Sequence, residues 1–268
     1  MKLLRSGLGR RRQVQLTFNL ARRQVLQRYR ESMFGLIWTL MTPMILLLIY
    51  GFVFNQVFKS RWVGEVEDEP YALLIFSGLM IFNFLSETLN GSSSLVQSNA
   101  LLVKRTTVSP RLLPYALTLS TLFAFTINSM AFLIMYVWLN GRLPSPYALQ
   151  VYVLVLAVAV FATGVGMIIS AVSAYFRDVQ QIVPLLTTAL LFLSPVFFPL
   201  ESLPDGIERV VRAVNPLSYP IEQSKNVLFL ERWLSLLGLL KYTVVALIVW
   251  WVGSTTYRVA SRGFADVV

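Results

Sequence analysis

The chain contains no cysteine and no histidine among its 268 residues. Without cysteine, disulfides, thiol nucleophiles and cysteine-ligated zinc or iron–sulfur clusters are excluded. Without histidine, the chain also lacks the usual general base near neutral pH and the most common metal ligand. The sequence is therefore poorly equipped for catalysis.

Charged residues are scarce as well. They make up 13% of the chain, whereas hydrophobic residues make up 56%, and the mean hydropathy is +0.65. A soluble domain carries about 25% charged residues, so this composition does not fit a water-soluble fold. The net charge of +10 leaves two explanations, which are binding to nucleic acid and contact with an anionic membrane face.

Long apolar stretches favour the membrane. A helix needs about 20 apolar residues to cross a hydrocarbon core of about 30 Å, and six stretches of the chain approach or exceed that length. The sequence thus predicts an all-α integral membrane protein in which residues 32–268 form a single domain of six transmembrane helices. The stretches are Ser32 to Phe58, Pro70 to Ser86, Leu112 to Gly141, Leu143 to Phe176, Val179 to Leu200 and Trp233 to Tyr257.

The distribution of charge predicts the orientation. An even number of spans places both termini on one side of the membrane, and lysine and arginine gather on the cytoplasmic side. With cytoplasmic termini, the inner segments carry fifteen basic and three acidic residues, and the outer segments carry eight basic and nine acidic residues. The positive charge is therefore interpreted as a record of orientation, and no nucleic-acid partner is expected.

Two ionisable residues interrupt the predicted spans or their ends, namely Glu87 and Lys241. Ionisable groups inside a membrane are costly and usually functional. Both residues lie near predicted helix ends, where a long side chain can reach water. The sequence therefore argues against a carrier that is driven by a proton or ion gradient.

Residues 1–31 form a polar, basic segment ahead of the first span. Val14, Phe18, Val25 and Tyr29 follow helical spacing, while Arg22 falls on another side of the helix. Such a basic amphipathic helix lies along the cytoplasmic headgroups. It can serve only as an anchor, or it can also form part of a docking surface for a cytoplasmic partner.

Residues 91–111 connect the second and third spans on the cytoplasmic side. An apolar patch between Asn99 and the basic pair predicts a short exposed helix that contacts a partner protein. The alternative is an interfacial loop that is held to anionic lipid. The candidate contact residues are Asn99, Leu101, Leu102, Val103, Lys104 and Arg105.

The region after the fifth span, residues 201–236, is rich in proline. Proline removes a backbone donor and clashes with the preceding helical turn, so Pro195 and Pro199 should end or kink the fifth span. Two short amphipathic helices around a proline-bounded turn are predicted to follow. They form either a re-entrant hairpin beside a translocation path or an external lid, and the candidate gate residues are Pro195, Pro199, Pro204, Asn215, Pro216, Pro220 and Glu222.

Aromatic residues are frequent in the first span. Most aromatics of a membrane protein face lipid or form interfacial belts, but aromatic faces also stack on the C–H side of sugar rings. Trp38, Tyr50 and Phe54 are therefore candidates for residues that line a channel. The chain has no G-x-x-x-x-G-K-[ST] motif, so any ATP-driven motor must be another polypeptide.

Five segments, in the same order along the chain, resemble the motifs of type-2 ATP-binding-cassette export permeases. Within that group they are most similar to the membrane subunits of polysaccharide exporters for O-antigen, capsule and teichoic acid. The resemblance begins at about Gln13 and runs to the C-terminus. The segments are Ser32 to Phe58, Asn99 to Pro114, Ala174 to Val179, Ser194 to Pro204 and Asn215 to Leu228.

The resemblance implies a non-catalytic permease in the bacterial cytoplasmic membrane. It implies a homodimer of six plus six helices, two copies of a separate cytoplasmic ATPase that binds ATP and Mg²⁺, and no cofactor in this chain. The segment Asn99 to Pro110 would be the coupling helix that faces the ATPase, and Leu203 to Leu230 would correspond to external gate helices. The cargo would be a lipid-linked polysaccharide.

Two alternatives remain at this point. The first keeps the architecture and changes the cargo to a drug or another amphipathic lipid. The second is an integral membrane transferase that acts on polyprenyl carriers. Such enzymes generally need clustered acidic or histidine side chains on a polar loop, and the predicted cytoplasmic loops contain Asp178 as an isolated acid.

Overall fold

The computed structural model describes residues 2–29, 37–53, 69–104 and 109–264, with the side chains of 2–11, 27–29, 37 and 39 left out. Every regular element within these ranges is helical. In chain order the elements are α1 (Lys2–Tyr29), α2 (Ile37–Phe52), α3 (Tyr71–Ser93), α4 (Leu95–Ser98), α5 (Ala100–Lys104), α6 (Leu112–Asn140), η2 (Pro146–Leu149), α7 (Gln150–Tyr175), α8 (Val179–Leu193), η3 (Leu200–Ser202), α9 (Asp205–Val214), α10 (Ser218–Phe229) and α11 (Leu236–Ala260).

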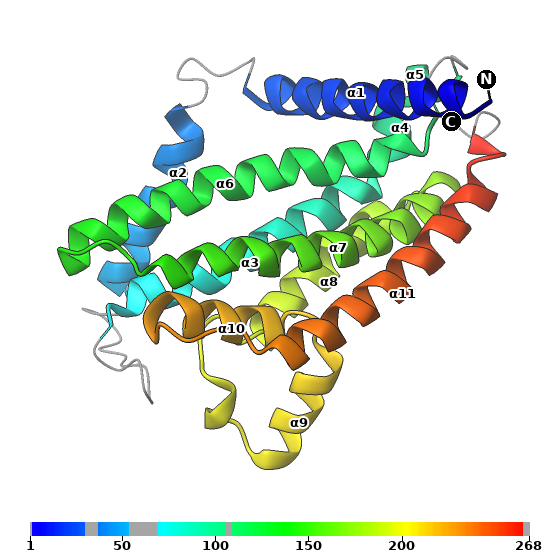
Figure 1. Ribbon diagram of the computed structural model, residues 1–268. Coiled ribbons are helices and arrows are strands. Elements are labelled where there is room, and N and C mark those ends of the chain that lie inside the picture. Colours follow the sequence, from blue (N-terminus) through cyan, green and yellow to red (C-terminus); the bar gives the residue numbers. More distant parts are fainter. Residues whose placement is uncertain (1, 30–36, 54–68, 105–108, 265–268) are drawn as a thin grey trace.

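The bundle is organised around α3, which packs against α2, α6, α7, α8 and α10. Figure 1 shows α3, α6, α7, α8 and α11 running between two ends of the molecule. The short helices α4 and α5 and both marked termini lie at one end, while α9 and α10 lie towards the opposite end. The fold thus separates the predicted coupling segment from the predicted gate region.

Four helices in the described part of the chain are long and apolar enough to cross a membrane: α3, α6, α7 with its preceding turn η2, and α11. The predicted first and fifth spans appear as shorter apolar helices of 16 and 15 residues. At about 1.5 Å per residue, α8 is shorter than the hydrocarbon core. These helices are consistent with an integral membrane protein, and the number of six spans stays a prediction.

The predicted end of the second span was wrong. That span was expected to stop at Ser86, yet α3 continues to Ser93. The hydroxyls of Thr88 and Ser92 donate to the backbone carbonyls four residues earlier, at 2.8 and 2.7 Å, so these polar side chains are satisfied within the helix. Glu87 therefore lies in the body of α3, not at its end.

Hydroxyl contacts join α3, α6 and α7 in the half of the bundle that leads to α4. Thr88 of α3 lies 2.8 Å from Thr121 of α6 between hydroxyl oxygens, and Thr118 of α6 lies 2.9 Å from Thr163 of α7. The hydroxyl of Ser170 on α7 donates to the carbonyl of Ser92 at 2.8 Å. Small hydroxyl residues that bridge helices are typical of membrane bundles.

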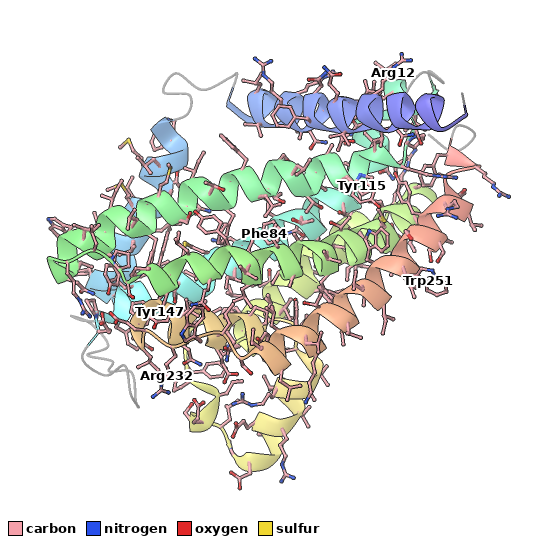
Figure 2. The ribbon with its side chains drawn as sticks, viewed as in Figure 1. Arg12, Phe84, Tyr115, Tyr147, Arg232 and Trp251 are labelled. Carbon is pink, nitrogen blue, oxygen red and sulfur yellow. The ribbon has the colours of Figure 1, made fainter. Side chains whose placement is uncertain are left out.

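The closest helix pair is α7 with α11, and glycine makes the approach possible. A Cβ atom added at Gly164 would lie 2.6 Å from the backbone of Trp250, and one added at Gly253 would overlap the carbonyl of Gly164. The outer face of α11 is apolar and exposed, and Trp251 points away from the bundle (Figure 2). One face of α11 therefore packs against α7, and the opposite face is an exposed apolar surface.

The predicted turn between the third and fourth spans is confirmed. Gly141 ends α6 with a left-handed backbone, φ 65°, which glycine adopts without strain. Beside it, the amide of Asn140 donates to the Glu69 carboxylate at 2.9 Å, and Arg142 lies 3.5 Å from Glu69 and 3.9 Å from Glu231. Three connections are thereby joined at this end of the bundle.

Candidate functional site: a polar-striped cavity, a coupling segment and a charged outer cluster

A cavity of about 740 Å³ opens between α2, α3, α6 and α8. Helix α3 supplies most of its wall, and α2 supplies the wall that faces α3. Its lining residues are Trp38, Thr42, Pro43, Leu46, Tyr50, Phe76, Leu79, Met80, Phe82, Asn83, Ser86, Glu87, Asn90, Gly91, Ala124, Asn128 and Leu191. A space with this mixture of aromatic and polar groups is suited to an amphipathic or hydroxylated ligand.

Polar residues of α3 form a stripe along the cavity. Asn83, Ser86, Glu87 and Asn90 recur at intervals of three and four residues, which places them on one face of the helix. The amide nitrogen of Asn90 donates to the hydroxyl of Ser86 at 3.2 Å and to that of Thr187 on α8 at 3.3 Å. We name these four residues the α3 polar stripe.

Sequence reasoning missed the α3 polar stripe. It placed Glu87 near a helix end, and the structure contradicts this prediction by placing Glu87 within α3 and on the cavity wall. The signal that would have found the stripe is the helical period of polar residues in an apolar segment. Because the predicted span ended at Ser86, Glu87 and Asn90 were not recognised as part of this helical period.

Two of the three predicted channel aromatics lie on the cavity wall. Trp38 and Tyr50 both belong to α2 and both line the space, and Trp38 is 43% exposed. Phe54 lies outside the described residues. The role of the two described aromatics as channel residues stays a prediction.

The coupling segment folds into α4 and α5, with Asn99 between them. The side-chain amide of Asn99 donates to the carbonyl of Leu95 at 2.9 Å, and the backbone carbonyl of Asn99 accepts the backbone amide of Leu102 at 2.9 Å. The amide of Gln97 donates to the carbonyl of Ser173 at 2.6 Å. This bond ties α4 to the end of α7.

The side chains of α5 point in different directions. Leu101 is 74% exposed, whereas Val103 is buried at 7% and packs with Leu95 and Leu113. Leu102 is half-buried beside the same cluster, Lys104 is exposed, and Arg105 lies outside the described residues. The exposed surface of α5 is therefore centred on Leu101 and Lys104, and its contact with a partner stays a prediction.

The predicted amphipathic helix is present as α1, and it lies alongside α6 (Figure 1). Thr17 and Ala21 form the buried face, and the Ser120 hydroxyl donates to the Gln24 side chain at 3.3 Å. The predicted apolar residues Val14 and Phe18 are 69% and 65% exposed. Arg22 is exposed and Val25 is half-buried, and the side chain of Tyr29 lies outside the described residues.

The predicted end of the fifth span is confirmed. Helix α8 stops at Leu193, and the backbone of Ser194 is extended, with ψ 150°, immediately before Pro195. Pro199 follows in the extended segment ahead of η3, and Pro204 precedes the first residue of α9. Proline thus sets the boundaries of this region.

Two short helices follow, as predicted, but they differ in burial. No residue of α9 is buried, whereas most of α10 is buried against α3 and α7. The turn between them contains Asn215 and Pro216, and Pro220 lies buried in the first turn of α10. The buried amide of Asn215 donates to the carbonyl of Leu193 and the hydroxyl of Ser194, both at 2.9 Å.

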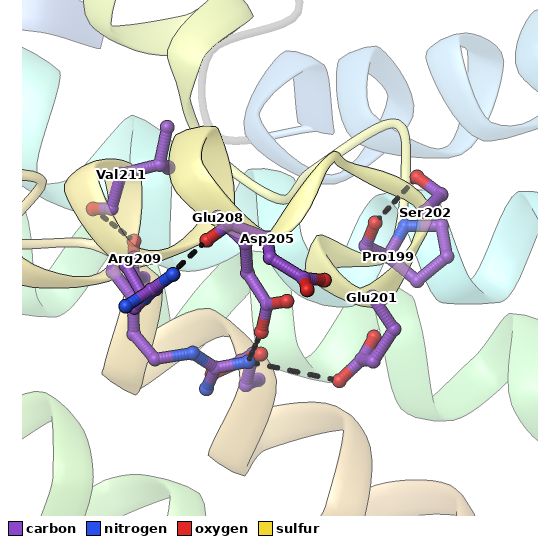
Figure 3. A network of polar contacts seen from close by, with 10 residues as sticks. Pro199, Glu201, Ser202, Asp205, Glu208, Arg209 and Val211 are labelled. Atoms are coloured by element: carbon purple, nitrogen blue, oxygen red, sulfur yellow. Dashed lines mark hydrogen bonds and ion pairs between the residues drawn. The ribbon is translucent and has the colours of Figure 1, made fainter.

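A charged cluster joins η3, α9 and α10 around Arg212. Figure 3 shows two of its carboxylates, those of Glu201 and Glu208, on neighbouring elements. The guanidinium lies 2.6 Å from Glu222, 2.9 Å from Glu208 and 3.8 Å from Glu201. Burial lowers the pKa of Arg212, but the hydrogen bond to Glu208 and the three carboxylate charges outweigh this effect and raise it. Burial raises the pKa of Glu222 to about 6, because the loss of hydration outweighs the opposing effect of the Arg212 charge.

In this region, the sequence analysis missed Lys225. Its side chain is 7% exposed, and its ammonium donates to the carbonyl of Pro195 at 2.6 Å. Burial lowers its pKa to about 7. Lys225 therefore connects α10 directly to the segment that follows α8. The two residues in contact, Lys225 and Pro195, are 30 positions apart in the chain.

The sequence profile of the ABC-2 type transporter family matches residues 15–229. The chain is 24% identical over 254 residues to the O-antigen export system permease protein RfbA of Myxococcus xanthus, covering 94% of this chain and 95% of the relative. It is 26% identical over 246 residues to the polysialic acid transport protein KpsM of Escherichia coli, covering 88% and 90%.

A third relative is the capsule polysaccharide export inner-membrane protein CtrC of Neisseria meningitidis, at 23% identity over 195 residues, covering 72% of this chain and 71% of the relative. The family profile extends from the amphipathic helix α1 to the last residue of α10. It therefore includes the cavity, the coupling segment and the charged cluster. The chain belongs to the ABC-2 type transporter family.

Proposed function

We propose that this chain is the membrane subunit of an ATP-driven exporter that moves a lipid-linked polysaccharide across the bacterial cytoplasmic membrane. One observation carries the proposal. Relatives that are named as O-antigen and polysialic acid transport proteins match this chain over nearly its whole length and theirs. The same matches favour polysaccharide over a drug or another amphipathic lipid as cargo, and a permease over a polyprenyl transferase.

The motor in this proposal is a separate nucleotide-binding subunit, which holds ATP and Mg²⁺. Its docking surface is the exposed part of α5 around Leu101, together with α1. The connection from Gln97 to the end of α7 supports this assignment, because a displacement of α5 would be passed through α4 into the bundle. No cofactor is assigned to this chain itself.

The working unit in this proposal is a homodimer that binds two copies of the ATPase, with six spans in each permease copy. Helices α2 and α8 flank the cavity, and both expose apolar side chains, such as Ile45 and Ile49 on α2 and Leu185 and Leu186 on α8. A second copy that covered these surfaces would enclose a path between the two cavities. Channel aromatics Trp38 and Tyr50 would then line that path.

Both termini are proposed to be cytoplasmic, and α9 and α10 to form the external gate. The excess of basic residues at the predicted inner segments supports this orientation. In the gate, the contacts of Asn215 and Lys225 to the segment after α8 support a coupled movement of α8 and α10.

Deletion of the gene tests the proposed function. A strain without the permease should lose surface polysaccharide and accumulate polyprenyl-linked glycan on the cytoplasmic side, and the wild-type gene should restore export. Normal surface polymer in the deletion strain would refute the proposal. Intact surface polymer combined with sensitivity to amphipathic drugs would favour the drug exporter instead.

A further inference from the structure

A second hydrophobic core lies at the end of the bundle that holds α4 and α5, apart from the main core around α3. Leu20 of α1 and Leu102 of α5 pack against its surface. Both elements that the proposed function assigns to ATPase docking, α1 and α5, therefore rest on this cluster. We name it the α5 core; together with other residues of α6 and α7, its buried members are Leu95, Val96, Val103, Leu113, Tyr257 and Phe264.

Two aromatic residues from the C-terminal part of the chain belong to the α5 core. Tyr257, near the end of α11, and Phe264, shortly after that helix, are each at most 1% exposed. Their rings meet edge to face with centroids 5.3 Å apart, and the ring of Tyr175 at the end of α7 lies 6.2 Å from that of Phe264. Aromatic contacts of this kind add to the stabilisation from burial, so they hold the segment after α11 in the core.

Hydrogen bonds from two of these aromatics support the coupling segment on both sides. The hydroxyl of Tyr257 donates to the backbone carbonyl of Pro110 at 3.1 Å, just before α6. The hydroxyl of Tyr175 donates to the carbonyl of Ala260 at 2.9 Å, which joins the end of α11 to the end of α7, where the Gln97 side chain also bonds. The coupling segment is thereby held through α7 on the α4 side and through α11 on the α6 side.

Helix α5 depends on this support for its orientation. A helix of five residues is too short to be stable alone, so its packing decides how it lies. Val103 is buried in the α5 core, and Leu101, two residues earlier, is exposed. Because residues two apart point in different directions on a helix, the position of Val103 in the core determines the direction of Leu101.

We propose that Tyr257 and Phe264 are positioning residues for the coupling of this permease to its ATPase, and that they hold α5 in the orientation that presents Leu101 to the nucleotide-binding subunit. The inference rests on the proposed function, since it takes α5 as part of the docking surface. Both side chains are buried, so they act through α5 and not by contact with the ATPase. They order α5 before binding, and binding then does not have to order it.

Spin labelling of the full-length permease in nanodiscs tests the positioning of α5 directly. The chain contains no cysteine, so Leu101→Cys provides a single labelling site. Phe264→Ala removes the ring from the α5 core and should increase the mobility of the label, seen as a narrower central line in the electron paramagnetic resonance spectrum. Phe264→Leu keeps an apolar side chain in the core and should restore most of the wild-type line shape.

Tyr257→Phe is the milder variant. It keeps the ring and removes the hydrogen bond to Pro110, whose carbonyl still accepts the backbone amide of Leu113 at 3.1 Å. The protein should therefore fold as the wild type does, and the label should gain mobility, but less than in Phe264→Ala.

Binding of the ATPase to permeases with the native Leu101 measures the functional consequence. If binding has to order one more backbone residue in Phe264→Ala, the affinity should fall on the order of tenfold. Phe264→Leu should bind with an affinity close to that of the wild type. A fall in affinity without a change in label mobility would overturn the proposal, because Phe264 would then not act through α5.

The matched control is Phe132→Ala, which removes a buried aromatic ring from the main core. It should lower the melting temperature and leave the mobility of the label on α5 unchanged. An equal gain of mobility in Phe132→Ala and Phe264→Ala would overturn the proposal, because the effect would then be a general loss of stability. Unchanged mobility in both Phe264→Ala and Tyr257→Phe would also overturn it.

The two assays separate this proposal from the proposed function. If no ATPase binds the wild-type permease, the proposed function loses its motor, and the positioning of α5 is judged by label mobility alone. If the ATPase binds the wild type and Phe264→Ala equally well, the proposed function stands and the positioning role falls.

Discussion

The side chain of Asn215 gives the sharpest structural prediction, because three hydrogen bonds converge on it at 9% exposure. Its amide nitrogen donates to the Leu193 carbonyl and the Ser194 hydroxyl, both at 2.9 Å, and its oxygen accepts the backbone amide of Leu217 at 2.8 Å. Replacing Asn215 with alanine removes all three. At about 1 kcal/mol net for each bond, the folded state should lose about 3 kcal/mol.

Thermal unfolding of the purified protein in detergent measures this loss. For a chain of this size, 1 kcal/mol lowers the melting temperature by roughly 2 to 4 °C, so Asn215→Ala should lower it by about 6 to 12 °C. Asn215→Asp keeps the acceptor for Leu217 and loses both donated bonds, and it should give a smaller decrease. Ser202→Ala, at an exposed hydroxyl that donates to the nearby backbone carbonyl of Pro199, is the control.

A melting temperature of Asn215→Ala equal to that of Ser202→Ala would refute the reasoning. The turn between α9 and α10 would then not be held to the end of α8 by this side chain. A decrease in export without a decrease in melting temperature would also contradict it, since the predicted effect acts through the stability of this junction.

Three further predictions concern other parts of the molecule. Leu101→Asp should abolish copurification of the ATPase while the protein stays in the membrane, whereas Val103→Asp should lower the yield of folded protein because its side chain is buried. The pKa of Glu222 is raised to about 6 from 4.5 in the unfolded chain, so the folded state binds the proton more readily. The stability of the protein should therefore rise as pH falls from about 6 towards 4.5. Melting curves of Glu222→Gln should lack this rise. Gly164→Ala should destabilise the protein because the new methyl group meets the backbone of α11 at 2.6 Å, and Gly206→Ala, which meets no atom within 4 Å, should melt as the wild type does.

Much of the architecture could be predicted from the chain because apolar stretches and prolines act locally. The helices α6, α7 and α11, the turn at Gly141 and the end of α8 before Pro195 all follow from residues within a few positions of each boundary. The pair α9 and α10 was also predicted from alternating polarity around the turn at Asn215. These features need no knowledge of distant contacts.

The wrong predictions have one physical cause, which is that contacts with other helices bury residues that the local sequence indicates as exposed or as part of a connection. Ser92 and Ser93 were placed in the connection after the second span, yet bonds to their own helix and to α7 keep them in α3. Glu87 was expected near the end of the span and lies in the body of the same helix. Val103 was expected to be exposed, but it packs beneath α5. Lys225 was one of the eight basic residues counted in the outer segments, yet it is buried, and the carbonyl that it contacts is 30 residues away in sequence.

The central claim is that this chain carries a polysaccharide across the membrane with energy from a separate ATPase. The most direct measurement reconstitutes the permease and the ATPase in inverted proteoliposomes and follows the protection of a radiolabelled lipid-linked glycan from an added glycosidase. The account predicts that ATP moves the glycan into the lumen, where the glycosidase cannot reach it, and that Leu101→Asp abolishes this protection. Equal protection with and without ATP, or protection by a permease reconstituted without the ATPase, would contradict it.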